Sequence, residues 1–302
     1  MSVLYYNNCW FTNVGEAFID IGAMKLIQYL FPDQRIVNFS RMSDYYISHL
    51  AGSGRQKAVN MWEYIGDEGD YLILPGMFAC EEYLNSLKER NFVDELLERG
   101  VKLVFLGLGQ CVYTQSETDS FRRYLECVRP EFVITRDAIT YENFKDVATC
   151  INGMDCAFWI KDSYNPSKVK PHQKYDVLTY NRSNESSRAL KMIGVNYVRA
   201  WHMQYGMKNR DIKDNVLISD TPYDYLSLYA CAHEVYTDLV HAAVPALQYG
   251  KHVLFERVDK RGGVIDAIEN LQIDSRGLLY VDEKDLEKQK NHIVNEISKL
   301  IV

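Results

Sequence analysis

The chain has 302 residues, and its 34 Lys and Arg side chains against 41 Asp and Glu give a formal net charge of −7. A hydrophobic fraction of 47% and a charged fraction of 25% are typical of a globular protein with a sizeable core. The length predicts about two domains. The acidic balance excludes a general nucleic-acid binder, because such a protein needs a basic face to neutralise phosphates.

The charge is unevenly distributed. Residues 1–160 carry 14 basic and 22 acidic side chains, whereas residues 161–302 carry 20 and 19. An anionic ligand is therefore better suited to the second half. Seven scattered cysteines without CxxC spacing favour a reducing compartment. With no signal-peptide pattern and no long apolar run, we expect a cytoplasmic protein without a membrane span, peripheral to a membrane at most.

Along the first half, apolar segments of strand type alternate with amphipathic segments of helix type. Continuous apolar runs, as at Val101–Leu106, are typical of parallel strands that are covered on both faces. The predicted strands are 4–6, 35–39, 70–75, 101–106 and 132–135. Helical spacing of apolar residues predicts helices over 15–30, 81–98 and 121–128.

A stretch rich in Lys, Pro and Asn, residues 161–174, has the composition of a linker. Beyond it the alternation restarts, with strands at 175–180, 197–201, 234–236 and 252–255 and helices at 186–193, 222–232, 240–249 and 283–301. This pattern predicts an α/β fold of two Rossmann-like, doubly wound domains, 1–160 and 175–302, that face each other across a cleft. Ligands are expected outside the carboxyl ends of the parallel strands.

Glycines and polar residues gather at the predicted strand-to-helix junctions of the first half. Asn13, Gly15 and Glu16 open the first helix, where backbone N–H groups can meet an anion or a sugar hydroxyl; a plain helix cap is the alternative. Further turns are predicted at Gly76 and at Gly107, Gly109 and Gln110. The second of these turns lacks the third glycine of GxGxxG, and no Walker sequence occurs, so a nucleotide phosphate loop has no support.

Two later junctions carry residues suited to chemistry. Arg136 follows a buried strand and can present a two-pronged donor to a carboxylate or phosphate, with an ion pair to Asp137 as the alternative. His241 lies in the first turn of a predicted helix, where the dipole disfavours the imidazolium and a neutral ring can relay a proton. A structural role is the alternative for a single histidine. His202 is a weaker candidate for ligand contact.

In their order and spacing, these junctions resemble the polysaccharide pyruvyl transferase family over nearly the whole chain. The resemblance rests on Asn13-x-Gly15-Glu16, Gly76, Gly107-x-Gly109-Gln110, Arg136-Asp137, Asp155-x-Ala157-Phe158 and a block from Tyr225 to Gly250 that contains His241. It implies two facing domains, as in GT-B glycosyltransferases. The last helix often returns to the first domain in that arrangement, and the amphipathic tail at 283–301 is the segment placed to do so.

The resemblance also implies an activity: transfer of an enolpyruvyl unit from phosphoenolpyruvate to a sugar of a surface or exopolysaccharide precursor. His241 matches the family's histidine, a general acid/base, and Arg136 matches its arginine, which binds the donor. Asp238 and Arg182 are expected on the donor side, and the glycine turns of the first domain on the acceptor side. The expected acceptor is a sugar or a lipid-linked oligosaccharide. Apart from phosphoenolpyruvate as donor substrate, no cofactor, metal or nucleic acid is expected.

Three positions depart from the family pattern. Leu239 stands where the family usually has an arginine, Glu16 where it has aspartate, and the turn at Gly76 is poorer in glycine. The arginine matters most, because a charged hydrogen bond is worth about 1.5–3 kcal/mol. The basic residues that can replace it are Arg182, Arg199, Lys208, Arg210 and Lys251. A divergent or inactive transferase, a GT-B glycosyltransferase using a nucleotide sugar and a non-catalytic sugar-binding relative are the alternatives.

Overall fold

The computed structural model describes residues 2–7, 13–40, 69–85, 87–166, 169–202 and 214–301. Contacts between residues divide the chain into two compact units. The first unit comprises Met1–Cys9 and Phe31–Gly153, and the second comprises Trp10–Leu30 and Met154–Val302. Each unit is built on a largely parallel sheet with helices, so the predicted α/β class is confirmed.

The sheet of the first unit runs β2-β1-β3-β5-β6-β7, and each neighbouring pair is parallel. Its strands are β1 (Ser2–Asn7), β2 (Arg35–Ser40), β3 (Tyr71–Pro75), β5 (Lys102–Gln110), β6 (Phe132–Thr135) and β7 (Cys150–Asn152). The short β4 (Phe78–Ala79) pairs with the end of β5. Every residue of β3 and β6 is buried, as continuous apolar runs in a covered parallel sheet require.

Four helices of this unit are α3 (Glu81–Asn85), α4 (Leu87–Glu98), α5 (Gln115–Val128) and α6 (Ala138–Phe144). Thr114 starts α5 by accepting the N–H of Glu117, and Arg129 ends it in the left-handed conformation. The aromatic rings of Phe105, Phe121 and Phe144 pack together in the core beneath α5 and α6. The sequence pattern missed α6 and β7, which are too short to show a clear period.

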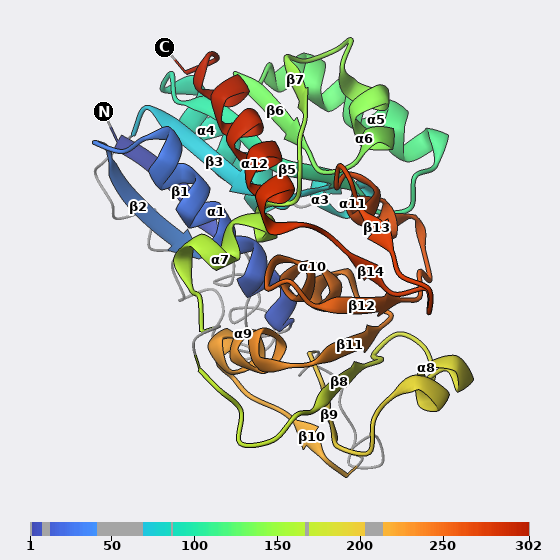
Figure 1. Cartoon of the computed structure of the whole chain (residues 1–302). Coiled ribbons are helices and arrows are strands. Elements are labelled where there is room, and N and C mark those ends of the chain that lie inside the picture. Colours follow the sequence, from blue (N-terminus) through green and yellow to red (C-terminus); the bar gives the residue numbers. More distant parts are fainter. Residues whose placement is uncertain are drawn as a thin grey trace, which may run out of the picture. The chain divides into compact units, whose positions relative to one another are not determined.

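The sheet of the second unit runs β10-β9-β8-β11-β12-β14-β13. Its strands are β8 (Asp176–Thr179), β9 (Tyr197–Ala200), β10 (Val216–Leu217), β11 (Glu234–Thr237), β12 (His252–Phe255), β13 (Gln272–Ile273) and β14 (Leu279–Tyr280). The pairs from β10 to β12 are parallel, whereas β14 is antiparallel to both of its neighbours. Figure 1 shows β8, β11 and β12 side by side, with their carboxyl ends at one edge of the sheet.

The helical segments of the second unit are α1 (Val14–Leu30), η3 (Cys156–Trp159), α7 (Ile160–Ser163), α8 (Ser187–Met192), α9 (Pro222–Cys231), α10 (Val240–Gln248), η5 (Lys260–Gly262), α11 (Gly263–Asp266) and α12 (Glu283–Ser298). Helix α1 packs against η3, α7, α9, α10 and α12. In the described part of the chain, no helix has the length and hydropathy that a bilayer crossing requires.

Helix α1 belongs to the second unit although it lies near the start of the sequence. Its backbone contacts η3 so closely that a Cβ on Gly22 would lie 2.0 Å from the carbonyl oxygen of Cys156. The contact-based division therefore differs from the predicted boundary at residue 160, both for α1 and for residues 154–160. The C-terminal helix α12 packs on α1. It thus contacts a segment from the first half of the sequence, but both helices belong to the second unit.

Candidate active site

His241 lies in the first turn of α10, at the carboxyl edge of the second sheet, and its side chain is half-buried. The backbone of Gly15, in the first turn of α1, lies directly against the imidazole. A Cβ on Gly15 would fall 1.8 Å from Nδ1 and 2.4 Å from Cγ of His241, so any side chain at residue 15 would overlap the ring. The two sequence candidates, Gly15 and His241, are therefore brought together by the packing of α1 on α10.

The start of α1 is held in place by hydrogen bonds on both sides of Gly15. Asn13 Oδ1 accepts the N–H of Gly15 at 3.0 Å, and Asn13 O accepts the N–H of Glu16 at 3.0 Å. The N–H of Val14 donates to the carbonyl oxygen of His202 at 3.2 Å. Asn13 thus acts as the helix cap, the alternative that the sequence left open. The same hydrogen bonds hold the backbone of Gly15 in its position against the ring of His241.

His202, whose carbonyl oxygen accepts the N–H of Val14, is buried, with 1% of its surface exposed. Its Nε2 lies 2.5 Å from the hydroxyl of Tyr229, and its ring meets Phe18 and Tyr225 edge to face. Nδ1 has no hydrogen-bond partner among the described residues. Burial, and secondarily the nearby charge of His241, lower the pKa of His202 from 6.5 to about 3. His202 is therefore a neutral, interior ring, and the structure does not place it where the weaker expectation of a ligand contact would require.

Asp238 follows β11 directly and organises the loop after β8. Its carboxylate accepts the backbone N–H groups of Asn181, Arg182 and Ser183 at 2.7–3.1 Å and the hydroxyl of Ser183 at 2.9 Å. The side chain is 2% exposed. Asp238 fixes the loop that carries Arg182, and the predicted contact with a donor stays a prediction.

The basic residues considered as replacements for an arginine at position 239 have different surroundings. Arg182 contacts Asp259 through Nη1. Arg199 donates from Nε and Nη2 to the two carboxylate oxygens of Glu185. Burial lowers the pKa of Lys251. Lys208 and Arg210 lie outside the described residues. Leu239 itself is 7% exposed, so position 239 presents a buried apolar side chain.

In the first unit, Arg136 is held at the carboxyl edge of the sheet. It is 3% exposed, and its guanidinium lies 4.5 Å from the centre of the Phe78 ring. On another side it touches the backbone of Gly109, where a Cβ would lie 2.2 Å from Nε of Arg136. The strands β4, β5 and β6 therefore fix a planar cation, which is the geometry that two-pronged binding of an anion requires.

The other predicted turns of the first unit have partly different structures. Gly76 does form a turn after β3, with a φ of 56°. The sequence predicted a turn at Gly107 and Gly109 after the strand 101–106, and this prediction is wrong. Both glycines lie inside β5, which continues past a register shift to Gln110. The side chain of Gln110 is fully buried and hydrogen-bonds to Thr118 and Asn143, so it ties β5 to α5 and α6.

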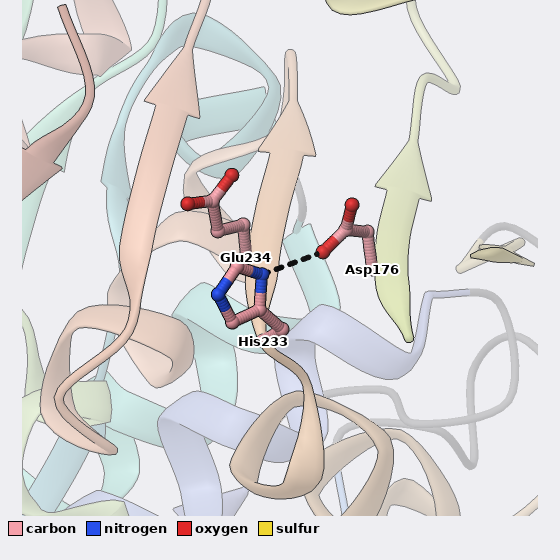
Figure 2. A group of neighbouring side chains, drawn as sticks. All are labelled: Asp176, His233 and Glu234. Carbon is pink, nitrogen blue, oxygen red and sulfur yellow. Dashed lines mark hydrogen bonds and ion pairs between the residues drawn. The ribbon is translucent and has the colours of Figure 1, made fainter. Parts of the chain in front are cut away.

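A group with metal-ligating side chains lies at the opposite edge of the second sheet, where β8 and β11 begin. Figure 2 shows Asp176, His233 and Glu234, whose ligand atoms lie within 4.8 Å of one another. Oδ1 of Asp176 lies 3.2 Å from Nδ1 of His233, and Oδ2 accepts the N–H of Gly194 at 2.7 Å. Both oxygens of Glu234 contact the guanidinium of Arg276. Since a cation already neutralises Glu234, the group is explained as an ion-pair network.

Three solved structures of similar fold carry names that include UDP or a UDP-sugar epimerase. The Staphylococcus aureus MnaA–UDP complex is 10% identical, with a TM-score of 0.57, and the match covers 99% of this chain and 89% of that one. A putative UDP-N-acetylglucosamine 2-epimerase from Listeria monocytogenes is 12% identical, with a TM-score of 0.55 and the same coverage. UDP-GlcNAc 2-epimerase from Neisseria meningitidis, bound to UDP-GlcNAc, is 11% identical, with a TM-score of 0.51 over 100% and 94% of the chains.

These likenesses define the class as an α/β protein of the GT-B type. A family model described as polysaccharide pyruvyl transferase matches residues 13–259. The chain therefore belongs to the polysaccharide pyruvyl transferase family, and with it to the transferases of polysaccharide biosynthesis. Curated proteins give no sequence match to the chain.

Sequence reasoning placed His241 and Gly15 at helix starts but missed the residues that support them. Tyr229 and Phe18, which enclose His202, gave no separate signal, because buried aromatic residues occur in every core. Asp259 and Arg261 were also missed; they lie beyond the predicted strand 252–255, in a segment without periodic pattern. Asp155, part of a motif that supports the family resemblance, caps η3 by accepting the N–H of Ala157 at 2.9 Å.

Proposed function

We propose that this transferase moves an enolpyruvyl unit from phosphoenolpyruvate to a sugar of a surface or exopolysaccharide precursor, with His241 as the general acid/base. The proposal is supported by family membership and by one observation: the imidazole of His241 is confined between the first turn of α10 and the backbone of Gly15. A catalytic acid must be positioned before the reaction begins, and this packing restricts the ring without burying it.

The proposed reaction proceeds in two additions. His241 in its protonated form gives a proton to the methylene carbon of the donor, and a sugar hydroxyl adds to the adjacent carbon and loses its proton. The bond from that carbon to the phosphate oxygen then breaks, and inorganic phosphate leaves. A second hydroxyl of the sugar adds to the same carbon and closes a pyruvate ketal. Of the two hydroxyl protons released, one restores the proton of His241 and the other is taken up by the phosphate. The sum is phosphoenolpyruvate plus a diol giving a ketal plus phosphate, with no oxidant or reductant.

Fixed positive charge is needed for the donor carboxylate and the departing phosphate. In the first unit, Arg136 has the rigid planar form that suits a carboxylate or phosphate, because Phe78 and Gly109 restrict its guanidinium. We assign it to donor binding on the basis of its match to the family's arginine. The acceptor is assigned to the turns of the first unit, of which Gly76 is one.

The test is phosphate release from phosphoenolpyruvate in the presence of a panel of free and lipid-linked sugars. Wild-type protein is expected to release phosphate with at least one acceptor. His241→Ala should reduce the rate about 10²- to 10⁴-fold, the contribution typical of a positioned acid/base, while circular dichroism stays unchanged. His292→Ala, an exposed histidine on α12, is the matched control. Full activity of His241→Ala would refute the assigned role.

A second candidate is a GT-B glycosyltransferase that uses a nucleotide sugar. Leu239 favours it, because the arginine usual in the family is replaced by a buried apolar side chain. Calorimetry with phosphoenolpyruvate and with uridine diphosphate sugars separates the two. Binding and turnover of a nucleotide sugar without binding of phosphoenolpyruvate would establish the second candidate, and glycan binding without any turnover would indicate a non-catalytic relative.

A further inference from the structure

Two arginines share one carboxylate at the carboxyl edge of the second sheet. Arg182 lies in the loop after β8, and Asp259 and Arg261 lie in the segment after β12. Nη1 of Arg182 contacts Oδ2 of Asp259 at 2.5 Å, and Nε of Arg261 contacts the same oxygen at 2.9 Å. Strands β8 and β12 flank β11, so this pair of arginines lies at the sheet edge from which α10 starts.

Donor groups remain available at this contact. Two guanidinium groups contact the single carboxylate of Asp259. Arg182 uses only Nη1, and Arg261 uses Nε and Nη2, so among the described residues Nε and Nη2 of Arg182 and Nη1 of Arg261 donate to no acceptor. Each side chain is about one-third exposed, at 34% and 29%, so these groups are open to a ligand from solvent. The nearby carboxylate of Asp238 already accepts four hydrogen bonds from the loop of residues 181–183.

The electrostatics agree with this geometry. The pKa of Arg182 is lowered by burial and then by the charge of Arg261, against which Asp259 and Asp238 act in the opposite direction. Burial and the charge of Arg261 together outweigh the two carboxylates, so the pKa of Arg182 is lowered overall. Arg199 provides the contrast on the same edge. Its fork is matched by both oxygens of Glu185, and Nη1 donates to the carbonyl of Asp214, so Arg199 is satisfied within the protein.

We propose that Arg182 and Arg261 form a phosphate-binding subsite that supplies, from two neighbouring loops, the positive charge that Leu239 does not provide. Spare N–H donors on two planar cations match the oxygens of a phosphate group. Asp238 positions the subsite by holding the backbone of Arg182, and Asp259 keeps the two cations together until the anion arrives. The assignment of the phosphate to phosphoenolpyruvate rests on the proposed function; the subsite itself also suits the diphosphate of a nucleotide.

The test is calorimetry of the full chain with three probes: inorganic phosphate, phosphoenolpyruvate and uridine diphosphate. Arg182→Gln and Arg261→Gln are each expected to weaken phosphate binding about tenfold or more, since each removes charged hydrogen bonds. Arg199→Gln, the matched control, should leave the affinity unchanged. Asp259→Asn should tighten phosphate binding several-fold, because it removes a competing negative charge; a purely structural ion pair would lose stability without that gain.

The outcomes separate this proposal from the proposed function. Arginine-dependent binding of phosphoenolpyruvate supports both, whereas arginine-dependent binding of uridine diphosphate alone supports the subsite and refutes the donor. Ketal formation that Arg182→Gln and Arg261→Gln leave unchanged would overturn the subsite and keep the function. Equal affinity for phosphate in wild-type, Arg182→Gln and Arg261→Gln proteins would overturn it as well.

Discussion

The backbone of Gly15 forms a wall against the imidazole of His241: a Cβ on Gly15 would lie 1.8 Å from Nδ1. A wall made of backbone cannot rotate away as a side chain does, so the ring of His241 has fewer positions open to it. The position of the histidine at the start of α10 therefore depends on the glycine at the start of α1.

Replacing Gly15 by alanine should displace His241. We expect Gly15→Ala to lower phosphate release about a hundredfold, the cost of misplacing a reacting group by about 1 Å. In a His241→Ala background the same change should cost less stability, because the overlapping ring is gone; urea denaturation of the four proteins gives the coupling.

Gly22→Ala is the control for the general effect of alanine in α1. Its Cβ would lie 2.0 Å from the backbone oxygen of Cys156, so this variant should lose stability but retain its activity per folded molecule. Wild-type activity of Gly15→Ala would show that the wall does not restrict the histidine.

Acid should destabilise the protein partly through His202. Its pKa is lowered to about 3 in the folded state, against about 6.5 in the unfolded chain. Between these values the unfolded chain takes up a proton that the folded chain refuses, so the free energy of unfolding falls by up to about 1.4 kcal/mol per pH unit as the pH drops below 6.5. Above pH 6.5 both states are neutral and the effect vanishes.

His202→Gln keeps a group near the hydroxyl of Tyr229 and removes the titration. Urea denaturation at several pH values from 7 to 4.5 should show a shallower loss of stability in this variant than in wild type. Parallel curves would contradict the depressed pKa. Since carboxylates titrate in both proteins, the difference between the curves isolates His202.

Asp238→Asn should loosen the loop of residues 181–183. An amide retains one acceptor oxygen but points an NH₂ group at backbone N–H donors. We therefore expect the free energy of unfolding to fall by about 1–3 kcal/mol. Hydrogen exchange of residues 181–183 should rise in the variant. Asp220→Asn, at an exposed position, is the control and should change neither quantity. Unchanged exchange in the loop would show that Asp238 does not hold it.

Gln110→Ala should reduce stability by about 1–3 kcal/mol, because it removes a buried amide that hydrogen-bonds to the buried Thr118 and the half-buried Asn143. Gln115→Ala, whose amide bonds to Asp119 on the surface, should change stability by less than about 0.5 kcal/mol. Chemical denaturation measures both. A small effect at Gln110 would indicate that water replaces its hydrogen bonds.

The sequence by itself determined the α/β class, the elements with strong periods and the family motifs. Strand β6 and helix α1 were located within a residue or two, because a buried strand is continuously apolar and a buried helix repeats its apolar face. His241 was placed at a helix start for the same reason. These patterns are local, so they report how a segment folds and how much apolar surface it carries.

Only the tertiary structure decided which surfaces meet. The sequence divided the chain at residue 160, yet α1 packs in the second unit, because its apolar surface is buried by η3, α7 and α10. The same packing brings Gly15 to His241. The burial of Gln110, the neutral interior state of His202 and the sharing of Asp259 by Arg182 and Arg261 likewise depend on partners distant in sequence. Such pairings leave no periodic trace along the chain, so no local pattern predicts them.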